Sequence, residues 1–280
     1  MSPSDRPVVT FLSDFGLDGA AAICRGVILA ICPGAQIVDI AHTVPKYAIA
    51  DGAFILASAL PWMPMGVHLT VVDPGVGTSR RPIAVRVARG DILVGPDNGL
   101  LIDGVDALGG VGEVRELANK ALWGPARSST FHGRDLFAPV AARLAAKPAT
   151  FDDLGPVLPA ADLVRLSPRT AAFRDGWLET EVIYVDSFGN LRLAGNASDL
   201  VQLGDSEKGP IPLDVELSAG SLGEPRVIES SLVATFGEVA EGASLLYLDS
   251  SGHPALADSQ GNAAARLAVR TGVRVRMRRR

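Results

Sequence analysis

The sequence of 280 residues lacks three features that would each indicate a particular class of protein. It has only two cysteines, so a disulfide framework like that of small secreted domains is excluded. It has no excess of positive charge, because 26 Lys and Arg residues face 31 Asp and Glu residues, and no nucleic-acid groove is therefore expected. It also lacks an uninterrupted apolar run. The most apolar region, residues 53–72, is broken by Pro61, Pro64 and Gly66, which excludes a continuous membrane-spanning helix.

The two cysteines indicate where the protein works. Cys24 and Cys32 lie in AAICRGVILAICPG, where apolar residues recur at helical spacing until Pro33. Two turns apart on one helix, the two thiols cannot form a disulfide without distortion. A first strand that starts within ten residues leaves no room for a signal peptide. Buried thiols in a reducing compartment are expected, and hence a cytoplasmic protein.

The composition is that of a folded globular protein. Apolar residues make up 48% of the chain and charged residues 20%, with both signs interspersed and no repeat or low-complexity segment. The length allows one large or two ordinary domains. The basic end, VRVRMRRR, alternates apolar and charged residues, which favours a half-exposed strand over an anion-binding arm.

The first half of the chain alternates strand and helix signals. Strands are predicted at residues 7–12, 36–40, 67–72, 82–87 and 91–95, and helices at residues 20–31, 52–60 and 134–146. Such alternation predicts a layered α/β domain with a mostly parallel sheet. Residues 147–169 carry four prolines and little periodicity, and are predicted to be a linker.

The second half has a different character. Short strands are predicted at residues 178–186, 190–194, 210–217, 244–249 and 272–278, with one helix at 262–268. This pattern predicts a smaller antiparallel barrel or sandwich. The predicted domains are therefore residues 1–165 and 166–280.

Polar groups follow three predicted strands of the first domain, at Asp14, Asp73 and Asp97–Asn98. Ligands of open α/β sheets bind outside the carboxyl ends of the strands, so three such groups on one rim favour a site over ordinary turns. The glycine-rich loop DPGVGT is not a dinucleotide fingerprint and leads into a strand, which disfavours nucleotide phosphates. The four histidines show no metal-ligand spacing, and no metal is expected.

Five motifs taken together carry a family resemblance. They are SDFG (13–16), VVDPGVGTSRR (71–81), PDNGLL (96–101), TFHGRD (130–135) and VDSFGN (185–190). The sequence resembles the S-adenosyl-L-methionine hydroxide adenosyltransferases, relatives of the bacterial fluorinase and chlorinase, nearly from end to end. The resemblance implies an N-terminal α/β domain, a C-terminal β-barrel-like domain and a homotrimer with active sites at subunit interfaces. It also implies S-adenosyl-L-methionine as the substrate and no cofactor.

The resemblance implies a catalytic set of Asp73, Arg80 and His132. Arg80 would favour an anionic oxygen nucleophile, His132 would accept or orient a proton, and Asp73 would hold the histidine tautomer. Which member removes the proton stays open. Arg81 is the alternative to Arg80, and the family spacing favours Arg80.

The remaining matches imply substrate contacts. Asp14 would accept hydrogen bonds from both ribose hydroxyls. In VDSFGN, Asp186 would meet the methionine ammonium, while Phe188 and Asn190 would contact the adenine; an ordinary hairpin turn is the alternative reading of this motif. The other implied contacts are Tyr47 over the ribose, Phe236 as a second aromatic wall, and Ser250 and Ser251 at the methionine end.

Water is favoured over halide as the nucleophile. Asp73 and Gly133 stand where the fluorinase has Tyr and Ser, and a carboxylate repels halide ions. An insertion that the fluorinase carries between the strands at 82–87 and 91–95 is missing. The expected reaction is hydrolysis to adenosine and methionine; the alternatives are a halide-using adenosyltransferase and a non-catalytic sensor of adenosyl ligands. Residues 249–260 depart from the family pattern and put substrate affinity in question.

Overall fold

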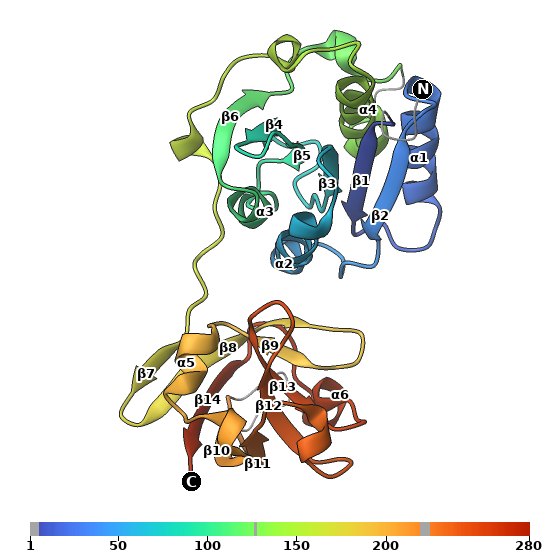
Figure 1. Ribbon diagram of the computed structural model, residues 1–280. Helices are drawn as coiled ribbons and strands as arrows, with labels where there is room; N and C mark the ends of the chain where they lie inside the picture. Colours follow the sequence, from blue (N-terminus) through green and yellow to red (C-terminus); the bar gives the residue numbers. More distant parts are fainter. Residues whose placement is uncertain (1–5, 126–127, 219–224) are drawn as a thin grey trace. The chain divides into compact units, whose positions relative to one another are not determined.

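The computed structural model describes residues 6–125, 128–218 and 225–280 (Figure 1). The chain divides into two compact units after Leu166, one residue from the predicted boundary. Each unit has a hydrophobic core of its own. In the described part of the chain, no helix is both long enough and apolar enough to cross a membrane.

The N-terminal unit is built on a six-stranded sheet in the order β2-β1-β3-β5-β4-β6. Its strands β1, β2, β3 and β5 run parallel, and β4 and β6 pair antiparallel to their neighbours. The strands are β1 (Val8–Ser13), β2 (Gln36–Ala41), β3 (Val67–Val71), β4 (Pro82–Val87), β5 (Ile92–Pro96) and β6 (Val111–Glu116). The chain leaves β1 toward β2 on one side and returns to β3 on the other, so the carboxyl ends of β1 and β3 flank the point where the strand order reverses.

Helices cover both faces of this sheet (Figure 1). Helices α1 (Ala20–Ile31) and α4 (Ala138–Ala146) share one core with Val9 and Phe11 of β1. Helices α2 (Ile49–Ala59) and α3 (Ile102–Ala107) cover the other face, where Leu12 points. Successive residues of β1 thus serve opposite cores, as expected for a strand that is buried on both faces.

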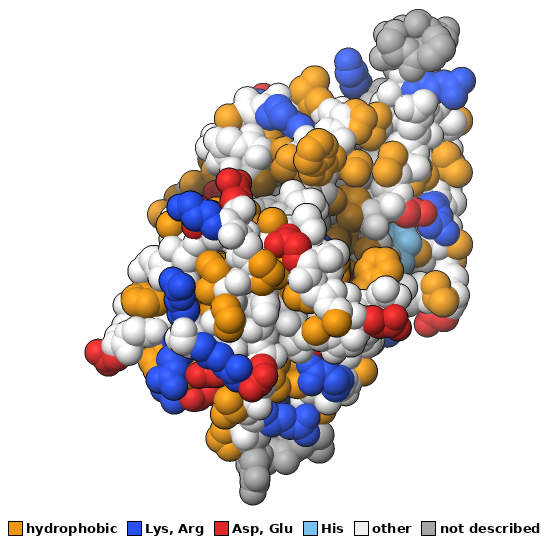
Figure 2. Space-filling view, turned by 60° about the horizontal axis from the view of Figure 1, so that its bottom comes forward, with side chains coloured by type: hydrophobic (Ala, Val, Ile, Leu, Met, Phe, Trp, Pro, Cys, Tyr) orange, Lys and Arg blue, Asp and Glu red, His pale blue; other side chains and the backbone are white. Residues whose placement is uncertain are grey.

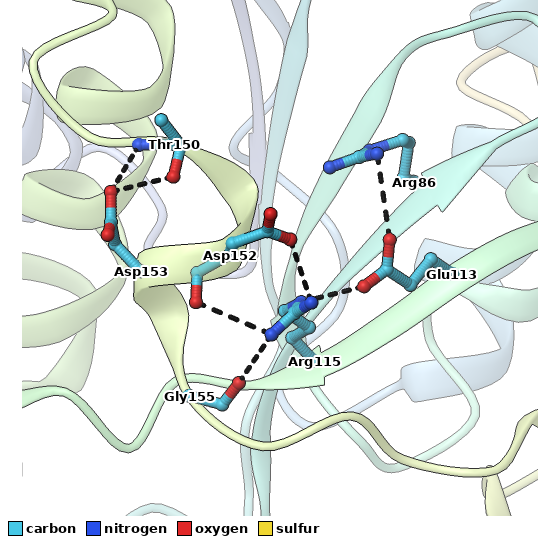
Figure 3. A network of polar contacts seen from close by, with 7 residues as sticks. All are labelled: Arg86, Glu113, Arg115, Thr150, Asp152, Asp153 and Gly155. Atoms are coloured by element: carbon cyan, nitrogen blue, oxygen red, sulfur yellow. Dashed lines mark hydrogen bonds and ion pairs between the residues drawn. The ribbon is translucent and has the colours of Figure 1, made fainter.

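Most of the segment that was predicted to be a linker belongs to the N-terminal unit. A 3₁₀ turn at Phe151–Leu154 starts with a capping box between Thr150 and Asp153. Arg115 of β6 donates hydrogen bonds to the carbonyl of Gly155 and to Asp152, and pairs with Glu113 (Figure 3). These contacts fasten the segment to the edge strand. Its prolines therefore lie in an ordered segment and not in a linker between the units.

The C-terminal unit is a closed antiparallel barrel apart from one parallel pair, β11 with β12. The strand order is β14-β10-β11-β12-β13-β9-β8, with β14 pairing to β8 to close the ring and β7 added at β8. The strands are β7 (Ala172–Arg174), β8 (Trp177–Val185), β9 (Leu191–Leu193), β10 (Ile211–Leu217), β11 (Arg226–Leu232), β12 (Ser244–Leu248), β13 (Pro254–Asp258) and β14 (Arg274–Arg279). Two short helices, α5 (Ala197–Val201) and α6 (Ala263–Leu267), accompany them.

The basic end of the chain is the half-exposed strand that its alternation predicts. In β14, Val275 and Met277 are buried, while Arg276 and Arg278 flank the ring of Trp177 at 4.5 Å each. Arg276 also pairs with Glu216. In the space-filling view, basic and acidic side chains lie beside one another at several places on the surface (Figure 2). Arg278 and Arg280 pair with Asp214, so three arginines of the basic end have carboxylate partners.

The predicted elements are found, with four strands and two helices added. The additional elements are α3, β6, β7, α5, β11 and β13. The last predicted helix begins as a π-helical turn, Gly133–Phe137, before α4. Pro254 begins β13. Both cysteines are buried and free, and burial raises the pKa of the Cys24 thiol to about 12.

Candidate active site

A bidentate ion pair at the strand ends joins Asp73 and Arg80. Asp73 follows β3, and the turn after it reverses the chain with Gly77 at a φ of 79°. A side chain at Gly77 would place its Cβ 2.6 Å from the carbonyl oxygen of Ser129, so only glycine fits. Arg80 donates from Nε to Asp73 Oδ1 at 3.0 Å and from Nη2 to Asp73 Oδ2. Both side chains are less than a tenth exposed, so the ion pair is buried and bidentate.

Arg80 also reaches His132. Its Nη2 lies 3.2 Å from His132 Nδ1, and because a guanidinium can only donate, Nδ1 is the acceptor. The neutral ring therefore carries its proton on Nε2. Burial and the charge of Arg80 lower the pKa of His132, which keeps the ring neutral near pH 7.

This arrangement differs from the expected one in a specific way. Asp73 was expected to hold the tautomer of His132, but Arg80 lies between them and sets the tautomer instead. The guanidinium is supported from behind by the ring of Phe137, at 5.2 Å from its centroid. Its Nη1 is buried and has no hydrogen-bond partner among the described residues. Buried donors of this kind are hydrogen-bonded in the great majority of proteins.

Arg81 points to a different carboxylate. It donates to Asp97 Oδ2 from Nε at 2.9 Å and from Nη2 at 2.5 Å, and to the carbonyl of Asp162. Asp97 Oδ1 in turn accepts the N–H of Val164. Arg81 and Asp97 therefore fasten the end of the N-terminal unit. Asn98, the other polar residue after β5, donates to the carbonyl of Val72.

Asp14 lies at the end of the neighbouring strand β1. Its Oδ2 accepts the backbone N–H of Tyr47 at 3.0 Å. Among the described residues its Oδ1 accepts no hydrogen bond, and the residue is 8% exposed. Tyr47 has a φ of 67° and an exposed ring. A carboxylate oxygen and an aromatic face are thus available together, as a sugar ring would require.

In the C-terminal unit, Asp186 organises the VDSFGN turn. Its Oδ1 accepts the N–H groups of Phe188 and Asn190, and its Oδ2 accepts from Asn190 Nδ2 at 2.9 Å. The side chain of Phe188 projects from this turn and is 74% exposed. The hairpin turn and the ligand-contact reading of the motif are thus compatible, because the turn presents the aromatic ring.

The other implied contacts of this unit lie around β12. Phe236 packs edge-to-face on Tyr247 at 4.8 Å, and both rings are partly exposed. Ser250 and Ser251 are exposed in the following turn, which Asp249 organises by accepting the N–H of Ser251. Asp249, one of the departures from the family pattern, pairs with Arg192 at 3.0 Å.

The structure therefore brings together Asp73, Arg80 and His132, and it brings Asp14 together with Tyr47. Sequence reasoning missed Ser13 and His42, which adjoin Asp14 in the N-terminal unit, and Tyr247, which packs on Phe236 in the C-terminal unit. Burial and the charge of Asp186 raise the pKa of Tyr247, which keeps it a neutral donor. No group of three or more His, Cys, Asp or Glu side chains suited to a metal is found among the residues described.

The fold and these clusters define a two-unit protein, with a carboxylate–guanidinium–imidazole site on a mixed α/β sheet, at the end of its parallel strands, and a β-barrel as the second unit. The sequence models of the SAM hydroxide adenosyltransferase N-terminal and C-terminal domains match residues 9–155 and 180–276. The chain belongs to the SAM hydroxide adenosyltransferase family.

Individual relatives agree with this assignment. The (R)-S-adenosyl-L-methionine hydrolase of Salinispora tropica is 44% identical over 99% of both chains. A fluorinase of an Actinoplanes species is 28% identical over 98% of both chains. The crystal structure of an uncharacterized conserved protein from Thermotoga maritima, 31% identical, superimposes with a TM-score of 0.84 over 97% of this chain and 100% of that one.

Proposed function

We propose that this protein hydrolyses S-adenosyl-L-methionine to adenosine and L-methionine, by in-line attack of water or hydroxide on the 5′ carbon of the ribose. The observation that carries the proposal is the contact set of Asp73, Arg80 and His132 at the carboxyl end of β3, in which the Asp73–Arg80 ion pair is buried. Its similarity to the Salinispora tropica hydrolase supports the same substrate.

The reaction requires mainly that the protein position and activate the nucleophile. A sulfonium leaves as a neutral thioether, so no acid has to protonate the leaving group and no cofactor is required. Water is a weak nucleophile and must lose a proton as it attacks. The unpartnered Nη1 of Arg80 donates to the attacking oxygen and favours its anionic form.

Asp73 is the acceptor of the proton. The Nδ1 lone pair of His132 is engaged by Arg80, and its Nε2 already carries a proton. The carboxylate of Asp73 keeps further lone pairs after accepting from Arg80. As the oxygen–carbon bond forms, the carbon–sulfur electrons leave with methionine and the water proton moves to Asp73. His132 orients the guanidinium.

Substrate contacts follow from the positions of the other groups. Asp14 Oδ1 accepts from the ribose hydroxyls and Tyr47 covers the sugar. We place the remaining contacts on the C-terminal unit of a neighbouring subunit in a homotrimer, which the exposed rings of Phe188 and Phe236 support. There Asn190 contacts the adenine edge. On this unit the methionine end meets Asp186, Ser250 and Ser251.

The proposed substrate also indicates the cellular compartment in which the protein works. S-adenosyl-L-methionine is an intracellular metabolite, and the two free buried thiols suit a reducing compartment. We therefore propose a cytoplasmic enzyme. No nucleic-acid or membrane partner is proposed.

The test is incubation of the purified protein with S-adenosyl-L-methionine in halide-free buffer, with adenosine and methionine followed by chromatography. Release of both products at equal rates, unchanged by added chloride and strongly reduced by His132→Ala, is the expected result. A chloride-dependent 5′-chloro nucleoside would show a halide-using enzyme instead. Tight binding of the substrate without any product would show a sensor.

A further inference from the structure

A second chain of polar side chains lies directly beside Asp14. Ser13 Oγ is 2.7 Å from His42 Nδ1, and His42 Nε2 is 3.0 Å from Asp39 Oδ1. Asp39 is in turn paired with Arg25 of α1 at 2.5 Å. Ser13 is the last residue of β1, and it comes next to His42 because the parallel register of β1 and β2 shifts by one residue between Phe11 and Leu12.

The direction of each hydrogen bond follows from the residue types. The carboxylate of Asp39 only accepts, so His42 carries its proton on Nε2. Nδ1 of the neutral ring is then an acceptor, and the hydroxyl of Ser13 donates to it. The same Ser13 oxygen accepts the backbone N–H of Phe15 at 3.3 Å.

These are the residue types of a hydrolase triad, but the geometry excludes that use. Ser13 is 0% exposed, so its hydroxyl cannot reach a substrate carbonyl. A histidine of that triad presents Nε2 to the serine, whereas His42 presents Nδ1. The chain of bonds can act only through the residues that it holds.

The residues that it holds carry the proposed ribose contact. Phe15 is fixed by Ser13 through its N–H and by Lys46 through its carbonyl, at 3.2 Å. The N–H of Gly16 donates to the carbonyl of His42 at 2.7 Å. The segment that contains Asp14 is thus held on both sides, and a rotation of the His42 side chain would break its bond to Ser13.

The side chain of Phe15 links this segment to the catalytic set. Its ring meets Phe131 edge-to-face at 5.8 Å. A Cβ on Gly133 would lie 2.7 Å from Phe15 Cζ, so the ring also lies directly over Gly133. Phe131 and Gly133 are the two neighbours of His132 in the chain. A shift of Phe15 would therefore move both Asp14 and His132.

We propose that Ser13 and His42, with Asp39 fixing the tautomer, are positioning residues. They set the carboxylate of Asp14 and the ring of Phe15 relative to Asp73, Arg80 and His132. This inference rests on the proposed function, because it assigns the ribose contact to Asp14.

The test uses isosteres of the two imidazole nitrogens. Asn in place of His42 puts an amide oxygen near Nδ1, where it can accept from Ser13, whereas Gln reaches the position of Nε2 and leaves Ser13 unpaired. We expect Ser13→Ala and His42→Gln to raise KM for S-adenosyl-L-methionine about tenfold, equivalent to about 1.4 kcal/mol. His42→Asn is expected to stay within about threefold of the unchanged protein, which a merely structural role of the ring would not produce.

A matched control exists on the same strand. Thr10 Oγ1 lies 2.9 Å from His68 Nδ1, and His68 Nε2 lies 2.9 Å from Asp91, with all three residues fully buried and Thr10 three residues before the end of β1. Thr10→Val removes a hydroxyl from the same kind of hydrogen-bonded series of side chains, but not from the one that adjoins Asp14. We therefore expect a lower Tm with an unchanged KM. Equal KM values for Ser13→Ala and the unchanged protein, or a His42→Asn defect as large as that of His42→Gln, would overturn the inference.

Binding of adenosine, measured by calorimetry on each variant, separates this inference from the proposed reaction. If the unchanged protein releases no adenosine from S-adenosyl-L-methionine, the proposed reaction is wrong. About tenfold weaker adenosine binding by Ser13→Ala and His42→Gln, but not by His42→Asn, would still support the positioning role. Unchanged adenosine binding by all three would refute it.

Discussion

Replacement of Arg80 by lysine tests the centre of the proposed mechanism. Arg80 donates twice to Asp73 and once to His132, and its Nη1 is free to meet the nucleophile. Lysine keeps the positive charge, but its three donors radiate from a single atom. Three donors cannot replace the two bonds to Asp73, the bond to His132 and the proposed contact with the nucleophile, so the substitution keeps the charge and loses the bonding geometry.

The expected loss follows from those contacts. Removal of one preorganised donor to a reacting oxyanion typically lowers kcat by about 10²–10³. Because the contact between His132 and the guanidinium is lost as well, we expect Arg80→Lys near the upper end of that range, with KM changed by less than about threefold. The buried Asp73 keeps a counter-charge, so the protein should fold, with a free energy of unfolding lower by about 2 kcal/mol.

The assay is single-turnover release of adenosine, with unfolding followed in urea on the same samples. Arg81→Lys is the matched control, because Arg81 makes a similar set of bonds to Asp97 and Asp162 without touching the catalytic set. We expect the control to lose stability but keep its kcat. A folded Arg80→Lys protein with kcat within threefold of the unchanged enzyme, or an equal loss in Arg81→Lys, would refute the role of the guanidinium.

Three further predictions concern other contacts. Gly133→Ala should lower kcat/KM about tenfold, since its Cβ would lie 2.7 Å from Phe15 Cζ and displace the ring; an unchanged value would contradict the packing. Burial lowers the pKa of His68 below its usual value of 6.5 in the folded protein. As the pH falls below 6.5, the unfolded chain binds a proton at this histidine before the folded protein does, so the free energy of unfolding decreases. The Tm of the unchanged protein should therefore fall more steeply from pH 7 to 5 than that of His68→Gln, and parallel curves would exclude His68 as the cause. Asp186→Asn places a donor opposite Asn190 Nδ2 and should lower the free energy of unfolding of the C-terminal unit by about 1–2 kcal/mol in urea titrations; unchanged stability would argue against the turn.

Much of the fold was predictable because its strands and helices are long or strongly patterned. Helix α1 is found at the predicted residues, since apolar spacing and Pro33 define it. The missed elements have weak local signals. Helix α3 has six residues with Gly104 inside it, and β13 is PALAD, which begins with proline and is poor in β-branched residues. Pairing of β13 with β12 and β9 stabilises it, and that contact is not local in the sequence.

The candidate site was predictable as a set of residues but not as a set of bonds. The glycine turn after β3 indicates that Arg80 returns to Asp73, and it does. The sequence does not show which of Asp73, Arg80 and His132 lies between the other two. That order depends on where the π-helical turn places His132. The position of Arg80 between the other two decides the tautomer of His132, and so it decides which group can take a proton.

Position, and not residue type, separates the two hydroxyl–histidine–aspartate chains that begin on β1. Thr10, His68 and Asp91 are fully buried inside the sheet, where hydrogen bonds from Arg89 and His68 outweigh burial and lower the pKa of Asp91 to about 2. That chain can affect only stability. Ser13 starts an equivalent chain three residues later, and the next residue after it carries the carboxylate that we assign to the ribose. Because ligands of parallel sheets bind at the carboxyl ends of strands, the same bonds at that end govern the geometry of a site.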